Sequence, residues 1–367
     1  MARLLLGILT LYLNDNRIIE ERKIYEQMTI EAAQLGINII VFTPEDMSTH
    51  QAKVRAHYFD TIQKRWARKW TNIPKYVFDR CRFQKSHRMK SLQSFKAQYP
   101  NIHYLNKPIG HKWIVHQKLE EHLPIRPYLP HTIHYSTVAD IAYMLNLYNV
   151  IYLKPVNGTG GRGILRIEKS SNEMVLIEGR DHDRNIISPQ KLSLSSLRTF
   201  VQRWNGANSN YLIQQGIPLQ LPSGRVHDYR VLVQKDGNGL WNVTGCAGRI
   251  GAKRSITANL HGGGSAVPME KLMRSFISSN INITAIQEEV NDLSIEIASY
   301  LEMCYFTLYE LAIDIAIDRE GQIWIIEINP KPAREVFKEI GLLEVYKSAI
   351  RKPLEYAKYQ YLKNENY

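Results

Sequence analysis

The sequence has few cysteines and no long apolar or low-complexity tract. Its 367 residues include three cysteines, Cys81, Cys246 and Cys304, which are far apart in the chain. This arrangement offers neither a disulfide framework nor the ligand spacing of a zinc site, so we expect a reducing, cytoplasmic compartment. No apolar run reaches the ~20 residues that a membrane-spanning helix requires, and we expect no membrane insertion.

The apolar run at residues 4–13 is the one segment with some likeness to a signal peptide. Gly7, Thr10 and Tyr12 interrupt it, and no small-residue cleavage site follows. We therefore interpret it as a buried first strand. The chain is 44% hydrophobic and 22% charged, which is typical of a globular protein, and its length suits two or three lobes.

Positive charge is concentrated in one part of the chain. The net charge is +12, and residues 51–100 contain thirteen Lys or Arg against two acidic residues. Aromatic residues are interleaved with these cations, which is one signature of a nucleic-acid or polyanion surface. We favour the simpler interpretation, an amphipathic region with a solvated basic face, and keep nucleic acid as an alternative partner.

The order of predicted elements indicates an α/β chain that begins with a parallel sheet. Strands are expected near residues 4–12 and 37–42, with a helix at 18–35 between them that ends at Gly36, and a third strand at 75–79. The remaining predicted helices lie at residues 112–123, 136–147, 195–204, 286–301 and from about 335. The remaining predicted strands lie at 150–154, 164–168, 174–178, 211–214, 228–234, 241–249, 309–317 and 322–328.

A glycine-rich loop, Gly158-Thr159-Gly160-Gly161-Arg162-Gly163, matches the pattern G-x-G-x-x-G. A dinucleotide-binding fingerprint must open a helix, but Ile164-Leu165-Arg166-Ile167 alternates like a strand, so the loop is predicted at a hairpin tip. Glycines there let backbone N–H groups approach phosphate oxygens. In protein kinases the lysine follows such a loop, whereas here Lys154 precedes it, and no kinase H-R-D or D-F-G element is present.

A second candidate site lies near the C-terminus. If the two last predicted strands pair through the turn at 318–321, Asp314 comes opposite Glu327, and alternation places Asn329 on the same face. Two carboxylates and an amide oxygen are hard ligands suited to Mg²⁺ that also binds phosphate. Both carboxylates are surrounded by apolar residues, where a charge without a metal or cationic partner would be costly. Two surface-facing edge residues are the alternative.

Taken in order, Lys154, the glycine hairpin, Asp314 and Glu327-Ile328-Asn329 resemble the ATP-grasp superfamily. The resemblance runs from about Lys112 to Pro332 and implies an ATP-grasp fold preceded by a small βαβ domain. It implies four parts: a basic first domain at 1–105, an N-terminal grasp lobe at 106–210, a C-terminal lobe at 211–335 and a helical tail at 336–367. Within the superfamily, residues 112–113, 226–230, 313–318 and 353–357 are most similar to the YheC/YheD spore-coat-associated group.

The resemblance also implies a role for individual residues. Lys112 and Lys154 would contact the nucleotide, with Gly158, Thr159, Gly160, Gly161 and Gly163 as its phosphate lid and Gln214, Gln215 and Ile217 in the linker that holds adenine. Arg230 and Arg249 would grip the transferred phosphoryl group or the substrate carboxylate, and Asp314, Glu327 and Asn329 would bind Mg²⁺. Selectivity would come from the first domain and from residues around His261 and Lys331, where Pro330-Lys331-Pro332-Ala333 departs from the usual Pro-Gly ending.

The implied function is an ADP-forming ligase that uses Mg-ATP to activate a carboxylate as an acyl phosphate for attack by an amine. Its partners would be ATP, small carboxylate and amine substrates, and, as candidates, spore-coat proteins. The sequence leaves three alternatives open: a non-catalytic ATP-binding module, a polyanion binder acting through residues 51–100, and a kinase that phosphorylates a hydroxyl group.

Overall fold

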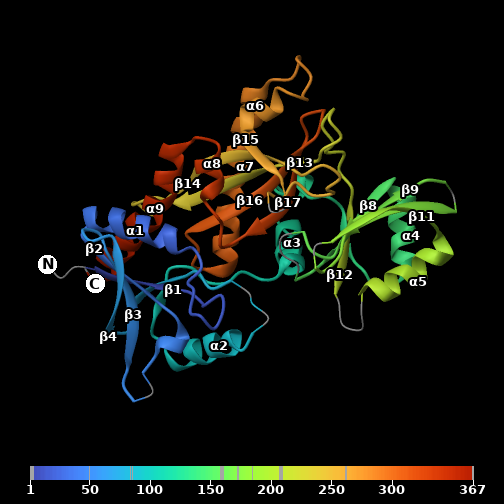
Figure 1. The fold of residues 1–367 in the computed structure, drawn as a ribbon. Helices are drawn as coiled ribbons and strands as arrows, with labels where there is room; N and C mark the ends of the chain where they lie inside the picture. The colour runs from blue at the N-terminus through green and yellow to red at the C-terminus, as the bar shows by residue number, and fades with distance from the viewer. Residues whose placement is uncertain are drawn as a thin grey trace.

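A computed structural model describes residues 4–48, 50–82, 84, 86–157, 161–171, 173–183, 185–205, 210–260 and 263–365. In these ranges the strands form three sheets, which we call the N-terminal, middle and C-terminal sheets (Figure 1). The N-terminal sheet lies at one end of the molecule, the middle sheet at the other, and the C-terminal sheet between them. No helix within the described ranges combines the length and hydrophobicity needed to cross a bilayer.

The N-terminal sheet has the strand order β4-β3-β2-β1-β5-β6. Its strands are β1 (Leu4–Leu9), β2 (Ile37–Phe42), β3 (Lys53–Asp60), β4 (Arg65–Asn72), β5 (Tyr76–Asp79) and β6 (His103–Tyr104), accompanied by the helices α1 (Arg22–Gln34) and α2 (Arg88–Gln98) and the 3-10 helix η1 (Pro44–Asp46). The central strand β1 runs parallel to both β2 and β5. The predicted parallel βαβ beginning is therefore confirmed.

Two features of this sheet differ from the sequence prediction. Helix α1 begins at Arg22 rather than Ile18, because Glu21 has a left-handed φ of 56° and Ile19 forms an isolated bridge with Tyr12. The basic segment contains an antiparallel hairpin, β3–β4, that we did not predict. Both strands of this hairpin carry exposed cations, and β4 is an edge strand, where charged side chains discourage pairing with other chains.

The middle sheet has the order β11-β10-β9-β8-β12-β7. Its strands are β7 (Thr132–His134), β8 (Val150–Pro155), β9 (Ile164–Lys169), β10 (Met174–Arg180), β11 (Ile186–Ser193) and β12 (Tyr211–Gln215), and its helices are α4 (Val138–Leu147) and α5 (Leu194–Asn205). Alternate residues of β8, β9 and β10 share one apolar core with both helices. Strands β8 and β9 are antiparallel, as predicted, so the glycine-rich segment connects a hairpin.

The C-terminal sheet has the order β15-β14-β13-β16-β17. Its strands are β13 (His227–Lys235), β14 (Trp241–Ile250), β15 (Ser265–Pro268), β16 (Glu310–Ile317) and β17 (Ile323–Asn329). The helices of this part are α3 (Lys112–Glu120), α6 (Met269–Met273), α7 (Ile283–Tyr305), α8 (Glu335–Glu339) and α9 (Leu343–Glu365), with the 3-10 helix η2 (Arg126–Tyr128). Helix α7 packs its predicted apolar stripe, which includes Val290 and Ile297, on the strands of this sheet.

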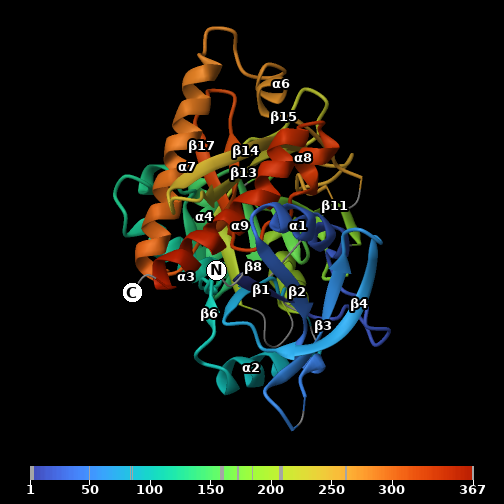
Figure 2. The same ribbon diagram turned by 90° about the vertical axis from the view of Figure 1, so that its left-hand side faces the viewer.

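Helix α9 joins the N-terminal and C-terminal sheets. Its residues Ile350 and Leu354 belong to the core formed by β1, β2 and α1, while Ala349 packs with Leu232 of β13. Figures 1 and 2 both show α9 lying alongside α1. The two sheets therefore share buried apolar surface, which favours one continuous body over two loosely tethered parts.

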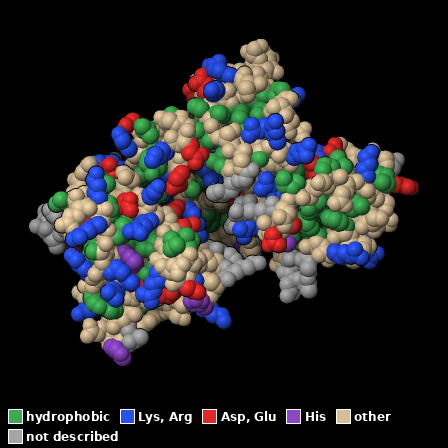
Figure 3. Space-filling model, in the orientation of Figure 1, with side chains coloured by type: hydrophobic (Ala, Val, Ile, Leu, Met, Phe, Trp, Pro, Cys, Tyr) green, Lys and Arg blue, Asp and Glu red, His purple; other side chains and the backbone are tan. Residues whose placement is uncertain are grey.

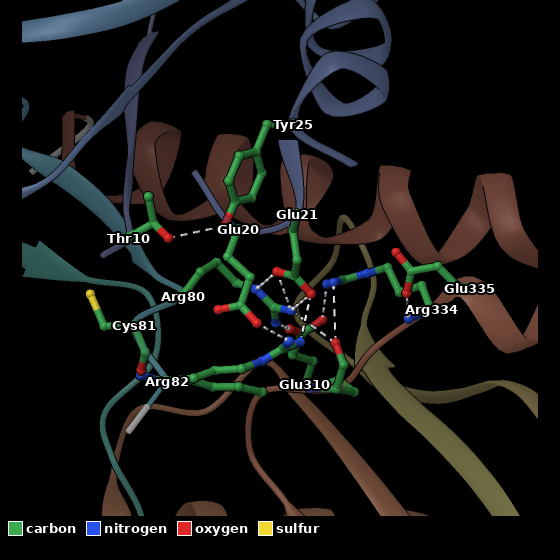
Figure 4. Close-up of polar contacts among 12 residues, drawn as sticks. Thr10, Glu20, Glu21, Tyr25, Arg80, Cys81, Arg82, Glu310, Arg334 and Glu335 are labelled. Atoms are coloured by element: carbon green, nitrogen blue, oxygen red, sulfur yellow. Dashed lines mark hydrogen bonds and ion pairs between the residues drawn. The ribbon is translucent and has the colours of Figure 1, made fainter. Parts of the chain in front are cut away.

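A buried ion network reinforces this junction (Figure 4). Arg80, which follows β5, donates to Glu310 at the start of β16 (2.9 Å), to both carboxylate oxygens of Glu21, and to the carbonyl oxygen of Pro332. Arg334 donates to the other oxygen of Glu310. The side chains of Arg80, Glu310 and Arg334 are each 1% exposed, so every charge in this cluster is satisfied inside the protein.

Candidate active site

Two carboxylates face each other across the last strand pair. Asp314 of β16 is the register partner of Glu327 of β17, and a bulge follows directly after Asp314. The Asn329 amide nitrogen donates to Asp314 at 3.3 Å, which places that side chain beside the same carboxylate. The three residues predicted as metal ligands are thus brought together, and their oxygen donors suit Mg²⁺.

These side chains do not form a complete metal site by themselves. In the described part of the chain, no three side chains of His, Cys, Asp or Glu gather in a way that could hold a metal ion. The set offers two carboxylates and one amide, which agrees with the usual way that proteins bind Mg²⁺, through one or two carboxylates completed by water and substrate phosphates. The donor chemistry fits a metal that arrives with a nucleotide.

Two arginines surround Asp314. Arg230, directly opposite on β13, donates to both oxygens of Asp314, at 2.9 and 3.0 Å. Arg249 of β14 lies 3.0 Å from the same carboxylate and makes two hydrogen bonds of 2.6 Å to Asp228. Burial alone would raise the pKa of Asp314, but the two guanidinium groups hold it below its usual value. Asp314 is therefore charged at neutral pH.

The two arginines differ in how accessible they are to a ligand. The Arg230 side chain is 21% exposed, whereas that of Arg249 is 3% exposed and has two acidic partners. Arg230 is therefore the one of the two that a ligand could reach more easily. Arg249 and Asp228 form a supporting pair on the adjacent strand. Sequence analysis did not assign Asp228, although alternation along β13 places it on the same face as Arg230.

Both predicted nucleotide lysines lie near the carboxylates. Lys112, at the start of α3, approaches Glu327 with 3.3 Å between Nζ and Oε1, and each side chain is 29% exposed. Lys154 of β8 donates to the Gln214 side chain on the adjacent strand β12. Burial, followed by the charge of Lys112, lowers the pKa of Lys154 to about 8, while Glu327 and Asp228 act in the opposite direction. Lys154 of the middle sheet is therefore close enough to Lys112, Glu327 and Asp228 for their charges to influence its pKa.

The described end of the glycine loop also contacts the C-terminal part. Gly161 has a φ of +74°, and a Cβ atom there would come within 2.8 Å of the Asn259 amide and 3.2 Å of the Thr257 hydroxyl. Both the backbone angle and the close contact favour glycine at this position. Gly163 has a φ of +66° and lies against His182. Gly158, Thr159, Gly160 and His261 lie outside the described residues.

The predicted adenine linker follows β12. The N–H groups of Gln215 and Gly216 already donate to the carbonyl oxygens of His131 and Val150, each at 2.8 Å. Among the described residues, the N–H of Ile217 has no hydrogen-bond partner. The Gln214 side chain binds Lys154 and the Thr132 hydroxyl. Ile217 is thus the linker residue whose backbone donor is left unpaired in the described part of the chain, and Gln214 holds the lysine side chain.

Lys331, around which we expected substrate selectivity to arise, has a partner in the N-terminal sheet. Its ammonium group binds the buried Asp79 carboxylate at 3.0 Å and the Cys81 carbonyl oxygen. It therefore belongs to the junction between the N-terminal sheet and the segment after β17. Figure 3 shows a hollow near the centre of this face, between the parts that hold the middle and C-terminal sheets, with basic and acidic side chains at its rim.

Comparison with known proteins agrees with this arrangement. Residues 101–360 match the family described as YheC/D like ATP-grasp. The chain belongs to this ATP-grasp family. It is 29% identical over 314 residues to the endospore coat-associated protein YheC of Bacillus subtilis, covering 84% of each chain. It is also 29% identical over 297 residues to YheD of the same organism, covering 80% of this chain and 64% of YheD.

Solved structures show the ATP-grasp fold at low sequence identity. D-cycloserine synthetase DcsG superposes with a TM-score of 0.55 at 11% identity, covering 95% of this chain and 99% of DcsG. The D-alanine-D-alanine ligase from Coxiella burnetii gives a TM-score of 0.52 at 9% identity, covering 99% of this chain and 98% of the ligase. The predicted mixed α/β ATP-grasp fold with an N-terminal parallel βαβ unit is therefore confirmed.

Proposed function

We propose that this YheC/D-like ATP-grasp protein is an ADP-forming ligase that activates a carboxylate as an acyl phosphate. The substrate carboxylate oxygen attacks the γ-phosphorus of ATP, and the bond to the ADP oxygen breaks. An amine then attacks the acyl carbon, phosphate leaves, and the amine loses a proton as the amide forms. The observation that carries this proposal is the shared location of Lys154, Lys112 and the Asp314–Glu327 pair.

The residues of the site suit each part of this reaction. Phosphoryl transfer depends mainly on positioning and on neutralising charge. Lys154 and Lys112 would bind nucleotide phosphates, and the Ile217 N–H would contact the adenine edge. Asp314, Glu327 and Asn329 would hold Mg²⁺, which supplies positive charge to the phosphate oxygens. Arg230 would face the transferred phosphoryl group, and Arg249 would hold Asp314 in position through their ion pair.

The glycine loop would cover the phosphates and exclude water. An acyl phosphate hydrolyses readily, so a closed site protects the intermediate until the amine attacks. The contact of Gly161 with Thr257 and Asn259 supports this role, because it links the hairpin of the middle sheet to a segment of the C-terminal part. PsnB, a fold relative with a TM-score of 0.52 and 12% identity, is described as an ATP-grasp ligase complexed with Mg and ADP.

Trapping the intermediate tests this proposal. The protein is incubated with Mg-ATP, pooled amino acids and short peptides, and hydroxylamine, and both ADP and hydroxamate are measured. We expect carboxylate-dependent ADP release together with hydroxamate, and loss of both in Glu327→Gln. ADP release that requires a hydroxyl substrate and yields no hydroxamate would indicate a kinase. Nucleotide binding without turnover would indicate a non-catalytic module.

The cellular setting is a separate part of the proposal. The relatives YheC and YheD are named endospore coat-associated proteins, and we infer the same association for this chain. Fluorescent tagging in a sporulating host would place the protein at the developing spore. Uniform distribution throughout sporulation would contradict this inference.

A further inference from the structure

The N-terminal sheet carries a cavity that the proposed ATP chemistry does not use. It has a volume of about 190 Å³ and is lined by residues of the β1–α1 connection and of the β3–β4 hairpin: Asn16, Arg17, Ile18, Ile19, Arg22, His57 and Trp66. Water occupies about 30 Å³ per molecule in the liquid, so the cavity suits a small ligand rather than a nucleotide. None of its lining residues belongs to the candidate active site.

Positive charge at this cavity is only partly balanced by acidic side chains. In the described ranges, no carboxylate lies within ion-pair distance of Arg17, whose backbone has a left-handed φ of 58°. Arg22 has only a loose contact of 3.9 Å with Glu26, and its guanidinium lies 5.3 Å from the centre of the Trp66 ring. A left-handed non-glycine residue is uncommon, and such residues cluster at functional sites.

The N-terminus of helix α1 adds to this positive field. Its first turn contains no acidic residue and instead carries Arg22 and Lys23. The helix dipole disfavours cations at this end and favours an anion. Four neighbouring carboxylates bind other arginines: Asp15 accepts from Arg88, Asp46 from Arg68, Glu20 from Arg82 and Glu21 from Arg80. Glu26 accepts from Trp66 and is also the 3.9 Å partner of Arg22.

A hydrogen-bonded chain fixes His57 at this cavity. Tyr12 donates its hydroxyl proton to Asp46 at 2.9 Å and lies 2.9 Å from His57 Nε2, so Nε2 carries a proton and donates to the tyrosine oxygen. Burial, against the opposing effect of Asp46, lowers the pKa of His57 to about 4, and Arg68, Arg22 and Arg17 add to this depression. The imidazole is therefore neutral, and the cationic lining consists of the arginines.

We propose that this cavity binds a small organic anion, a carboxylate or phosphate attached to an apolar or planar group. Arg17 and Arg22 would bind the anion, since guanidinium groups match the geometry of both carboxylate and phosphate. Ile18, Ile19 and Trp66 would contact the apolar part. Charge complementarity and cavity size support this class of ligand, and the site is separate from the one that binds ATP in our proposed function.

Titration with simple anions tests the proposal on the full chain. The protein is labelled with ¹⁵N-tryptophan, and the indole N–H signal of Trp66, assigned through Trp66→Phe, is followed during addition of benzoate, phenyl phosphate or inorganic phosphate at constant ionic strength. We expect saturable shifts with at least one probe. Binding of benzoate would identify carboxylates as ligands, and binding restricted to the two phosphate probes would identify phosphates.

Variants separate a built site from general surface charge. Arg17→Gln and Arg22→Gln should each weaken binding by at least about tenfold, since each variant removes a charged hydrogen-bond donor to the anion. Lys23→Gln removes one positive charge from the same helical turn without lining the cavity, and should change affinity less than about twofold. Equal effects of all three variants, or no saturable shift with any probe, would overturn the proposal. Because the assay contains no nucleotide, its failure leaves the ATP chemistry untouched.

Discussion

Strand β16 contributes to two charge clusters that differ in their accessibility. At its start, Glu310 joins Arg80 and Arg334 in the junction network, where all three side chains are 1% exposed. Four residues later, Asp314 belongs to the candidate site, where the neighbouring Glu327 and Lys112 are each 29% exposed. The first cluster is closed to solvent, and the second is open at one side.

The difference indicates distinct roles for the two clusters. In the junction network, each arginine has carboxylate partners, so no group is left to bind a ligand. In the candidate site, the half-buried Lys154 has an amide partner and a pKa lowered to about 8, and Glu327 is paired with Lys112, each side chain being partly exposed. Groups with perturbed pKa values beside a cleft are typical of functional sites. Variants of the first cluster should lower stability, and variants of the second should lower activity, so the two sets together test this distinction.

The largest expected effect is on stability at the junction. Arg80→Leu removes the central cation of a buried network and leaves Glu21 with Arg82, and Glu310 with Arg334, as the remaining arginine partner, so we expect a loss of about 3–5 kcal/mol of unfolding free energy. Arg82→Leu is the matched control, because Arg82 also binds Glu21 but is 33% exposed, and it should cost less than about 1 kcal/mol. Urea denaturation measures the unfolding free energy of both variants. Similar losses in the two would contradict the conclusion that the network is closed to solvent.

Next comes the effect of Glu327→Gln on turnover. The amide keeps the shape of the side chain but removes a charged metal ligand, so Mg-ATP turnover should fall by about 100-fold or more while unfolding free energy changes by less than about 1 kcal/mol. Glu320→Gln, in the exposed turn before β17, is the control. Steady-state ADP release measures the effect. A normal rate in Glu327→Gln would remove this residue from the metal site.

Lys154→Met should reduce nucleotide affinity by about 10–100-fold, because it removes a phosphate-binding charge from a partly desolvated site. The same variant should slightly raise stability at pH 7, since below pH 8 the folded protein carries the desolvated charge of Lys154. Lys191→Met, exposed on β11 of the same sheet, is the control. Calorimetry with Mg-ADP measures the expected loss of affinity, and urea denaturation measures the expected gain in stability. Unchanged affinity would contradict the assignment of Lys154 to the nucleotide site.

The smallest expected effect is the uptake of a proton by Lys154 when nucleotide binds. Between pH 8 and the ordinary lysine pKa of 10.5, the unfolded state holds the Lys154 proton more tightly than the folded state, so this group's contribution to stability rises with pH. Bound phosphate should reverse the shift, so nucleotide binding at pH 8 should take up about half a proton. Affinity should fall as the pH rises above 8. Calorimetry in buffers of different ionisation enthalpy measures the uptake, which Lys154→Met should abolish.

Local sequence patterns predicted much of the fold. The β8–β9 hairpin, the β16–β17 pair and the apolar stripe of α7 follow from alternation or helical spacing with clear turns between them. Strands β4 and β11 were missed because they are largely exposed edge strands, so their sequences lack a regular apolar alternation. The start of α1 was placed too early because a left-handed Glu21 leaves no local signal.

Contacts between distant residues could not be predicted in the same way. The Asp314–Glu327 pair was predictable because one short turn connects its strands. Arg80 and Glu310 are 230 positions apart, and nothing in either segment indicates that they meet. Likewise, Lys331 follows shortly after β17 in sequence, but Asp79 of the N-terminal sheet binds its charge. Local patterns thus indicate which side chains share a strand face, while domain packing decides which charges remain free.

A crystal structure with Mg²⁺ and a non-hydrolysable ATP analogue tests the central claim most directly. We expect the metal within bonding distance of Asp314, Glu327 and Asn329, with the phosphates contacting Lys154 and the adenine against Ile217. A nucleotide bound away from Lys154, or a metal that contacts neither Asp314 nor Glu327, would contradict the account.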